Sequence, residues 1–184
     1  MAVLRRAAAC VAAMIVLTGL AAPGLGAAAA AAGQALTEAQ AKAGFLYNCA
    51  MFVAWPAAAS SRDEVVIGVL GDEAVSAIVA DMQGQKVNGR TLRVLPVSSL
   101  DRLDGFHILF VAGDNARANR DVVARIGSAP ILTVGETDNF TAAGGVVRLF
   151  TDQGRLRFEI NMTRAEGAGL RVSAKMLGLA KIVR

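Results

Sequence analysis

The chain has 184 residues and a formal charge of +4, with 19 basic and 15 acidic side chains. Basic and acidic residues are interspersed, and no basic run is interleaved with aromatic side chains, so the charge does not indicate a nucleic-acid-binding protein. One histidine and two cysteines are too few for a predicted metal site, and no nucleophile motif accompanies them. The sequence therefore predicts no catalytic residue, no metal ligand and no cofactor, and the protein is not expected to be an enzyme.

Residues 1–32 have the layout of a cleaved secretory signal peptide. Arg5 and Arg6 precede an apolar run, and an alanine-rich stretch ends near Ala32. The alternative is an uncleaved membrane anchor, but glycines and a proline interrupt the run before a span of about 20 apolar residues is complete. The pattern therefore favours cleavage.

Cleavage between Ala27 and Ala32 would leave residues 33–184 as a single domain. Without the two leader arginines the formal charge falls from +4 to +2, and Cys49 is the one cysteine that remains. A lone thiol cannot form a disulfide within the monomer. We expect a periplasmic protein that does not insert into the membrane after cleavage.

The mature chain alternates patterns that are typical of helices and strands. Thr37 to Gln40 reads as a capping box, whose side chains satisfy free N–H groups at a helix start, and Trp55-Pro56 is expected to end that helix. Strands that alternate with helices predict right-handed crossovers and a mostly parallel sheet. Periodicity and turn residues predict strands over 65–70, 91–97, 106–112 and 130–135, and helices over 73–82 and 116–126.

The C-terminal part departs from this alternation. Two strand patterns, residues 146–150 and 155–160, flank a turn at 152–154 and predict an antiparallel hairpin. A closing helix is expected to begin near Ser173, whose hydroxyl can act as its N-cap. The predicted fold class is α/β, a Rossmann-like three-layer sandwich with a mostly parallel sheet, a C-terminal antiparallel β-hairpin and a closing helix.

Glu159 is the unusual residue of the hairpin. Strand alternation places Phe158 and Ile160 on one face and Glu159 on the other. The carboxylate is expected to be solvated, to pair with a neighbouring cation such as Arg148, or to contact a partner, and ion pairing is the favoured alternative. Asn161 is expected to end the strand and to hold the following turn through its side-chain amide.

The last segment, residues 170–183, carries more apolar side chains than one narrow helical stripe can bury. Some are expected to pack on the sheet, and others to form an exposed strip with a basic rim, as an interface requires. A wholly buried helix is the equal alternative. The candidate partner-binding residues are Phe158, Glu159, Leu170, Arg171, Met176, Leu179 and Ile182.

Two residues are candidates for a small ligand pocket. Trp55, the one tryptophan of the chain, would form a wall of this pocket with Arg62 nearby, and the ligand would be aromatic or anionic. Packing of the helix end is the favoured interpretation of Trp55. His107 precedes an apolar strand and is expected to have a hydrogen-bonded structural role. Cys49 is expected to be a buried structural thiol.

Three blocks of the sequence together resemble one family. They read FLYNCAMFVAWP at residues 45–56, QGRLRFEIN at 153–161 and GLRVSAKMLGLAKIV at 169–183. In this order and spacing they resemble the YfiR family of small periplasmic proteins over nearly the whole mature chain. The resemblance implies a regulator that binds the periplasmic sensor domain of an inner-membrane diguanylate cyclase, represses the cyclase, and lowers cyclic-di-GMP and biofilm formation.

The same resemblance implies further partners. It suggests a homodimer, and release of the cyclase when another envelope protein sequesters the regulator. Phe106 stands where YfiR-like chains often carry a cysteine, so a disulfide-dependent response is not carried over to this chain. The alternative function is a periplasmic small-molecule-binding module that feeds a membrane kinase or transporter.

Overall fold

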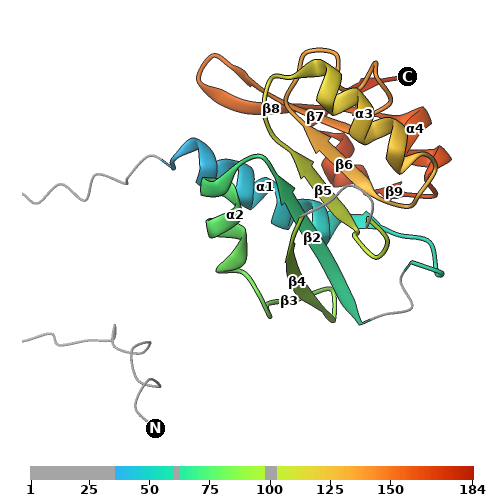
Figure 1. The fold of residues 1–184 in the computed structure, drawn as a ribbon. Coiled ribbons are helices and arrows are strands. Elements are labelled where there is room, and N and C mark those ends of the chain that lie inside the picture. The colour runs from blue at the N-terminus through green and yellow to red at the C-terminus, as the bar shows by residue number, and fades with distance from the viewer. Residues whose placement is uncertain (1–35, 60–62, 98–102) are drawn as a thin grey trace, which may run out of the picture. The chain divides into compact units, whose positions relative to one another are not determined.

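The structure is a computed structural model, and it describes residues 36–59, 63–97 and 103–184 (Figure 1). The predicted signal peptide and Arg62 lie outside these residues. The elements of the described residues are, in chain order, α1 (Glu38–Phe52), β1 (Val53–Ala54), β2 (Glu64–Leu70), α2 (Glu73–Ala80), β3 (Lys86–Val87), β4 (Arg90–Pro96), β5 (Ile108–Val111), α3 (Ala116–Ile126), β6 (Leu132–Gly135), β7 (Val147–Asp152), β8 (Arg155–Asn161), α4 (Met162–Gly167), β9 (Arg171–Val172), α5 (Ala174–Leu177) and β10 (Lys181–Val183).

Eight of the described strands form one sheet in the order β10-β8-β7-β6-β5-β2-β4-β3. The strands β4, β2, β5, β6 and β7 run parallel, whereas β8 and β3 run antiparallel to their neighbours β7 and β4. When the five parallel strands are numbered as they occur in the chain, their spatial order across the sheet is 2-1-3-4-5, which is the flavodoxin-like order of doubly wound sheets. The predicted mostly parallel α/β sheet and its antiparallel hairpin are confirmed.

Two apolar clusters, one on each face of the sheet, produce the three layers. Val65, Ile67 and Val69 of β2 belong to the cluster that includes α1 and α2, whereas Val66 belongs to the cluster that includes α3. Figure 1 shows α3 and α1 on opposite faces of the sheet. Residues 65–69 are all buried because both faces of β2 are covered.

The first helix begins as predicted and ends earlier. Thr37 Oγ1 accepts the N–H of Gln40 at 3.2 Å, and Gln40 Oε1 accepts the N–H of Thr37 at 2.8 Å, which completes the capping box. The helix ends at Phe52 rather than at Trp55. The reason is that β1 is extended and pairs with β9 in a separate two-stranded sheet.

The glycines around Phe140 are required by close packing. A Cβ atom at Gly135 would lie 2.3 Å from the Phe140 ring, and one at Gly145 would lie 2.2 Å from it. Gly144 has a φ of +97°, a conformation that glycine adopts without strain. Phe140, which is 1% exposed, therefore sits between two backbone segments that approach it closely.

The closing helix begins where predicted but is one turn long. Ser173 caps α5, which ends at Leu177 after four residues. Residues 181–183 then form β10, which pairs in parallel with β8. The expectation of a longer helix is wrong, because residues 181–183 pair with β8 as a strand, an extended conformation that the β-branched Ile182 and Val183 favour.

Sequence patterns did not predict α4. Asn161 ends β8 as expected, and its Oδ1 accepts the N–H of Arg164 at 2.9 Å, so the same side chain caps α4. Asn161 Nδ2 donates to the carbonyl of Thr141 at 3.1 Å, and Arg164 Nε donates to the carbonyl of Gly144 at 2.8 Å. These bonds tie α4 to the segment that precedes β7.

Candidate partner-binding surface

Glu159 is enclosed by the molecule's own residues. Its side chain is 6% exposed, and Thr141 Oγ1 donates to Oε1 at 2.7 Å. Arg148 Nη1 lies 3.8 Å from Oε1, and Lys181 Nζ lies 3.3 Å from Oε2. The predicted ion pair with Arg148 is confirmed. The expectation that Glu159 contacts a partner is corrected, because its carboxylate already links β8 to β7 and to the edge strand β10.

Arg148 organises the face of the hairpin on which Glu159 lies. It stands opposite Glu159 in the β7–β8 register and also pairs with the exposed carboxylate of Asp138. Its guanidinium lies over the ring of Phe150, 5.0 Å from the centroid. A partly desolvated arginine stacked on an aromatic ring and held by two carboxylates is a rigid structural element.

Three more of the predicted interface residues contribute to the core. Leu170 is 2% exposed and Met176 is 5% exposed, and both belong to the apolar cluster that includes α1. Phe158 is half-buried, with its ring centroid 4.9 Å from that of Phe45 on α1. The expectation that Leu170 and Met176 face a partner is corrected, because both side chains, Leu170 after α4 and Met176 on α5, pack against the core.

Leu179, Ile182 and Arg171 are the predicted interface residues that reach solvent. Leu179 is 71% exposed and Ile182 is 43% exposed, and Arg171 is exposed as well. Among the described residues only Leu36 and Met51 are other large apolar side chains with comparable exposure. Because Leu179 and Ile182 are three positions apart, the end of the chain is the main place where large apolar side chains are exposed on the described surface.

A hollow of about 420 Å³ adjoins Ile182. Its lining comes from α4, α5 and β10, namely Met162, Thr163, Glu166, Leu177, Ile182 and Arg184. Exposed basic residues belong to the same segments, and Lys175 Nζ lies 5.2 Å from the centroid of the Phe52 ring. We call the exposed residues Arg171, Lys175, Leu179, Lys181, Ile182 and Arg184, with this hollow, the C-terminal surface.

Sequence reasoning missed the α4 part of this surface. Met162, Thr163 and Glu166 enter it because α4 turns back beside β8 and β10. The available signal was Asn161, an N-capping residue type, followed by good helix formers over residues 162–166. A helix of six residues is too short to show a clear periodicity.

Trp55, the predicted wall of a ligand pocket, is buried. Trp55 is 5% exposed and donates its indole N–H to the carbonyl of His107 at 3.1 Å. The two rings meet edge to face, with centroids 5.5 Å apart, and the guanidinium of Arg90 lies 6.0 Å from the indole centroid. Trp55 therefore packs as a structural residue. The predicted partner Arg62 lies outside the described residues.

His107 has the hydrogen-bonded structural role that the sequence predicted. Its Nδ1 accepts the N–H of Val66 at 3.1 Å, and its Nε2 lies 2.9 Å from the carbonyl oxygen of Ala59. Arg90 Nη2 lies 2.8 Å from the same Nε2 and also donates to the carbonyl of Glu64. Burial lowers the pKa of the Arg90 guanidinium, and the charge of Asp63 partly offsets this effect.

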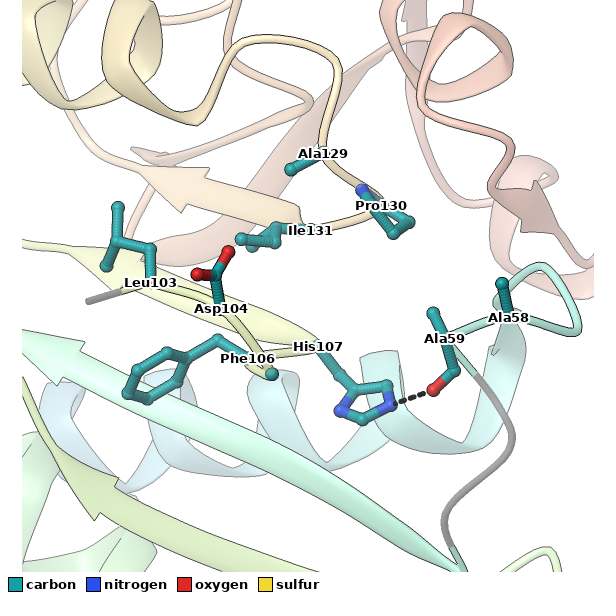
Figure 2. Close-up of a pocket in the computed structure, with 10 residues that line it drawn as sticks. Ala58, Ala59, Leu103, Asp104, Phe106, His107, Ala129, Pro130 and Ile131 are labelled. Carbon is teal, nitrogen blue, oxygen red and sulfur yellow. Dashed lines mark hydrogen bonds between the residues drawn. The ribbon is translucent and has the colours of Figure 1, made fainter. Parts of the chain in front are cut away.

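A cleft opens beside His107 (Figure 2). Its volume is about 330 Å³. Three segments line it: Ala58 and Ala59 after β1, residues 103–107 before β5, and residues 129–131 before β6. The cleft therefore lies at the amino ends of two parallel strands.

Cys49 is the buried thiol that the sequence predicted. It is 0% exposed on α1, and no second cysteine occurs in the described residues to pair with it. Desolvation by burial raises the pKa of the Cys49 thiol far above its ordinary value. The same residues contain no group of three or more His, Cys, Asp or Glu side chains that could hold a metal ion.

The family follows from a sequence match that covers most of the chain. The sequence pattern of the YfiR/HmsC-like family matches residues 39–181, which extend from α1 to the start of β10. The chain belongs to the YfiR/HmsC-like family. Membership implies a periplasmic regulator of diguanylate cyclase signalling, and YfiR-like proteins are regulators rather than known enzymes.

Comparisons with individual proteins add little to the family match. No curated protein matches this YfiR/HmsC-like chain. Two solved structures that resemble it are the ABC domain from Streptococcus pneumoniae in complex with L-Trp and a conserved domain protein from Vibrio cholerae O1 biovar El Tor. They share 15% and 14% identity, with TM-scores of 0.45 and 0.44 over 65% and 66% of this chain. The aligned part spans 55% of each of those chains, about half of their length.

No helix within residues 36–59, 63–97 and 103–184 of this YfiR/HmsC-like protein is both long and apolar enough to cross a lipid bilayer.

Proposed function

We propose that this protein represses an inner-membrane diguanylate cyclase by binding the periplasmic sensor domain of the cyclase, and that it thereby lowers cyclic-di-GMP and biofilm formation. Membership of the YfiR/HmsC-like family supports this proposal. The observation that carries the choice of surface is the exposure of Leu179 and Ile182 on the C-terminal surface, where a hollow adjoins Ile182. Exposed apolar side chains with a polar rim are typical of protein interfaces.

Repression of this kind is a shift of population. The regulator binds the inactive conformation of the sensor more tightly than the active one. A differential binding free energy of about 1–3 kcal/mol is sufficient to change the active fraction substantially. A second envelope protein that covers the C-terminal surface would release the cyclase, and a homodimer would present two such surfaces.

The proposal includes export of the chain. Arg5, Arg6 and the alanine-rich stretch support a signal peptide that is removed between Ala27 and Ala32. Intact-mass measurement of protein purified from the envelope tests this step. A mass that retains residues 1–26, recovered with the membrane fraction, would contradict it.

The central experiment compares matched lysine substitutions. Leu179→Lys and Ile182→Lys place a charge on the C-terminal surface, where binding would desolvate it without a partner and weaken capture by several-fold or more. Leu36→Lys is the control, because Leu36 is 73% exposed, as Leu179 is at 71%. Affinity capture from detergent-solubilised envelope and the cellular cyclic-di-GMP level are measured for each folded variant.

Deletion of the gene is expected to raise cyclic-di-GMP and biofilm formation. Leu179→Lys and Ile182→Lys should reproduce this effect, whereas Leu36→Lys should behave as the unmodified protein. If deletion raises cyclic-di-GMP but both C-terminal variants still capture the cyclase, the contact surface lies elsewhere. If deletion leaves cyclic-di-GMP unchanged, the repressor function is wrong.

The alternative, a small-molecule-binding module that feeds a membrane kinase or transporter, has one observation in its favour. This is the cleft beside His107, not the Trp55–Arg62 pocket that the sequence suggested. The gene neighbourhood distinguishes the two functions. A neighbouring gene that encodes a membrane kinase or transporter would favour the alternative.

A further inference from the structure

The cleft beside His107 has walls that the core holds in place. Phe106, Leu103 and Ile131 line it and also belong to the apolar cluster around α3, where each is less than 10% exposed. His107 holds Ala59, on the facing wall, through the hydrogen bond to its carbonyl (Figure 2). A volume of about 330 Å³ is at the lower end of the range of roughly 300–1,000 Å³ for pockets that bind small molecules.

Several polar groups in the lining of the cleft are already hydrogen-bonded within the protein, and the Asp104 carboxylate is the charged group that remains for a ligand. Both ring nitrogens of His107 lie within hydrogen-bond distance of protein groups: Nδ1 accepts the N–H of Val66, and Nε2 lies 2.9 Å from the carbonyl oxygen of Ala59 and 2.8 Å from Arg90 Nη2. The N–H of Phe106 is directed to the carbonyl of Leu103, and that of Ile131 to the carbonyl of Ala129. Asp104 is the one acidic or basic side chain, apart from His107, in the lining.

The Asp104 carboxylate is exposed, and no described residue forms an ion pair or a hydrogen bond with it. Figure 2 shows it directed to the same space as Ile131, across from the His107 imidazole. A carboxylate at the wall of a mainly apolar cleft favours a cation with an apolar body over a neutral or anionic compound of the same shape.

The usual ligand position of this fold is at the other end of the sheet. Doubly wound sheets bind ligands at the carboxyl ends of their strands. Here the hollow beside Asn119 and Thr137, after β6, measures about 10 Å³. A Cβ atom added at Gly71, just after β2, would lie 3.4 Å from the carbonyl oxygen of Ala112. The amino ends of β5 and β6 hold the larger cleft instead.

We infer that this cleft is a binding site for a small organic ammonium compound, with the ammonium group at Asp104 and an aromatic or aliphatic body against Pro130, Ile131 and Phe106. The site shares no residue with the C-terminal surface, and the inference does not depend on the proposed repression of a cyclase. This site lies apart from the pocket expected at Trp55 and Arg62, and its ligand is cationic, whereas an aromatic or anionic compound was expected there.

Three compounds of similar shape and different charge test the site: 2-phenylethylammonium, 2-phenylethanol and 3-phenylpropionate. Each is titrated into the ¹⁵N-labelled mature protein, and amide chemical shifts are followed by NMR. We expect shifts centred on Gly105, His107 and Ile131, and an affinity for the ammonium about 2- to 5-fold higher than for the alcohol, as for an exposed ion pair. The carboxylate should bind more weakly than the alcohol.

Two variants with the same loss of charge complete the test. Asp104→Asn should reduce the affinity for the ammonium to that for the alcohol. Asp114→Asn, which removes an exposed carboxylate just after β5 and so at the opposite end of that strand, should leave both affinities unchanged. Two results would overturn the inference. One is that chemical-shift changes are absent from residues 103–107 and 129–131 or are centred elsewhere. The other is a preference for the ammonium compound that Asp104→Asn does not reduce.

Discussion

Arg148 and Glu159 stand opposite each other in the β7–β8 hairpin, with Nη1 and Oε1 3.8 Å apart. Lys181 of β10 reaches the other carboxylate oxygen at 3.3 Å. The hairpin therefore holds the edge strand through one buried carboxylate as well as through backbone pairing. This arrangement places the C-terminal surface on a framework that the hairpin stabilises.

Glu159→Gln should lower the free energy of unfolding by about 2 kcal/mol, because it leaves the Arg148 guanidinium, 16% exposed, with Asp138 as its one carboxylate partner among the described residues. For a domain of this size that corresponds to a fall in melting temperature of roughly 4–8 °C. Asp152→Asn, which changes an exposed residue of the same hairpin, is the control and should shift melting by less than about 1 °C. Equal melting of both variants would show that the Glu159 charge is not structural. Calorimetry measures both.

Gly145→Ala and Gly44→Ala should change stability in opposite directions. The added methyl at Gly145 meets the Phe140 ring at 2.2 Å and should cost about 1–3 kcal/mol through overpacking. At Gly44 on α1 nothing lies within 4 Å of the added Cβ, so alanine should stabilise the helix by about 0.5–1 kcal/mol. Urea denaturation gives both values, and a neutral Gly145→Ala would contradict the packing at Phe140.

Met176→Lys and Leu179→Lys separate core from surface within one short segment. Met176 is 5% exposed, so a lysine there should unfold the domain or lower its stability by several kcal/mol. Leu179 is 71% exposed, so its replacement should leave circular dichroism and melting near those of the unmodified protein. The reverse result would contradict the burial of Met176 and the exposure of Leu179.

Cys49 should be unreactive in the native protein. Burial raises the pKa of its thiol, so the thiol stays protonated at about pH 9, where an accessible cysteine with an ordinary pKa of about 8.5 is mostly thiolate. A thiol-specific colorimetric reagent should therefore react after denaturation and not before it. Reducing agent should also leave the melting temperature unchanged. A fall of several degrees, as expected for loss of a disulfide worth roughly 2–4 kcal/mol, would mean that Cys49 pairs between chains.

Interactions between neighbours in the chain determine much of the fold, and these parts are predictable without knowledge of tertiary contacts. The capping box at Thr37, the buried run of residues 65–69 and the hairpin were predictable, because each depends on neighbours in the chain or on a strand period of two. The same period placed Glu159 on the face away from Phe158, where Arg148 meets it.

Tertiary structure alone decided which apolar residues near the C-terminus reach solvent. Residues 170–183 are short apolar runs broken by Gly178, and such runs fit a helix or a strand equally well. Pairing with β8 selected the strand for residues 181–183, whereas packing of α5 against the core buried Met176 and left Leu179 exposed. The cleft likewise required the segments before β5 and β6 to meet Ala59. These outcomes depend on contacts between segments that are distant in sequence, and local propensity carries no information about them.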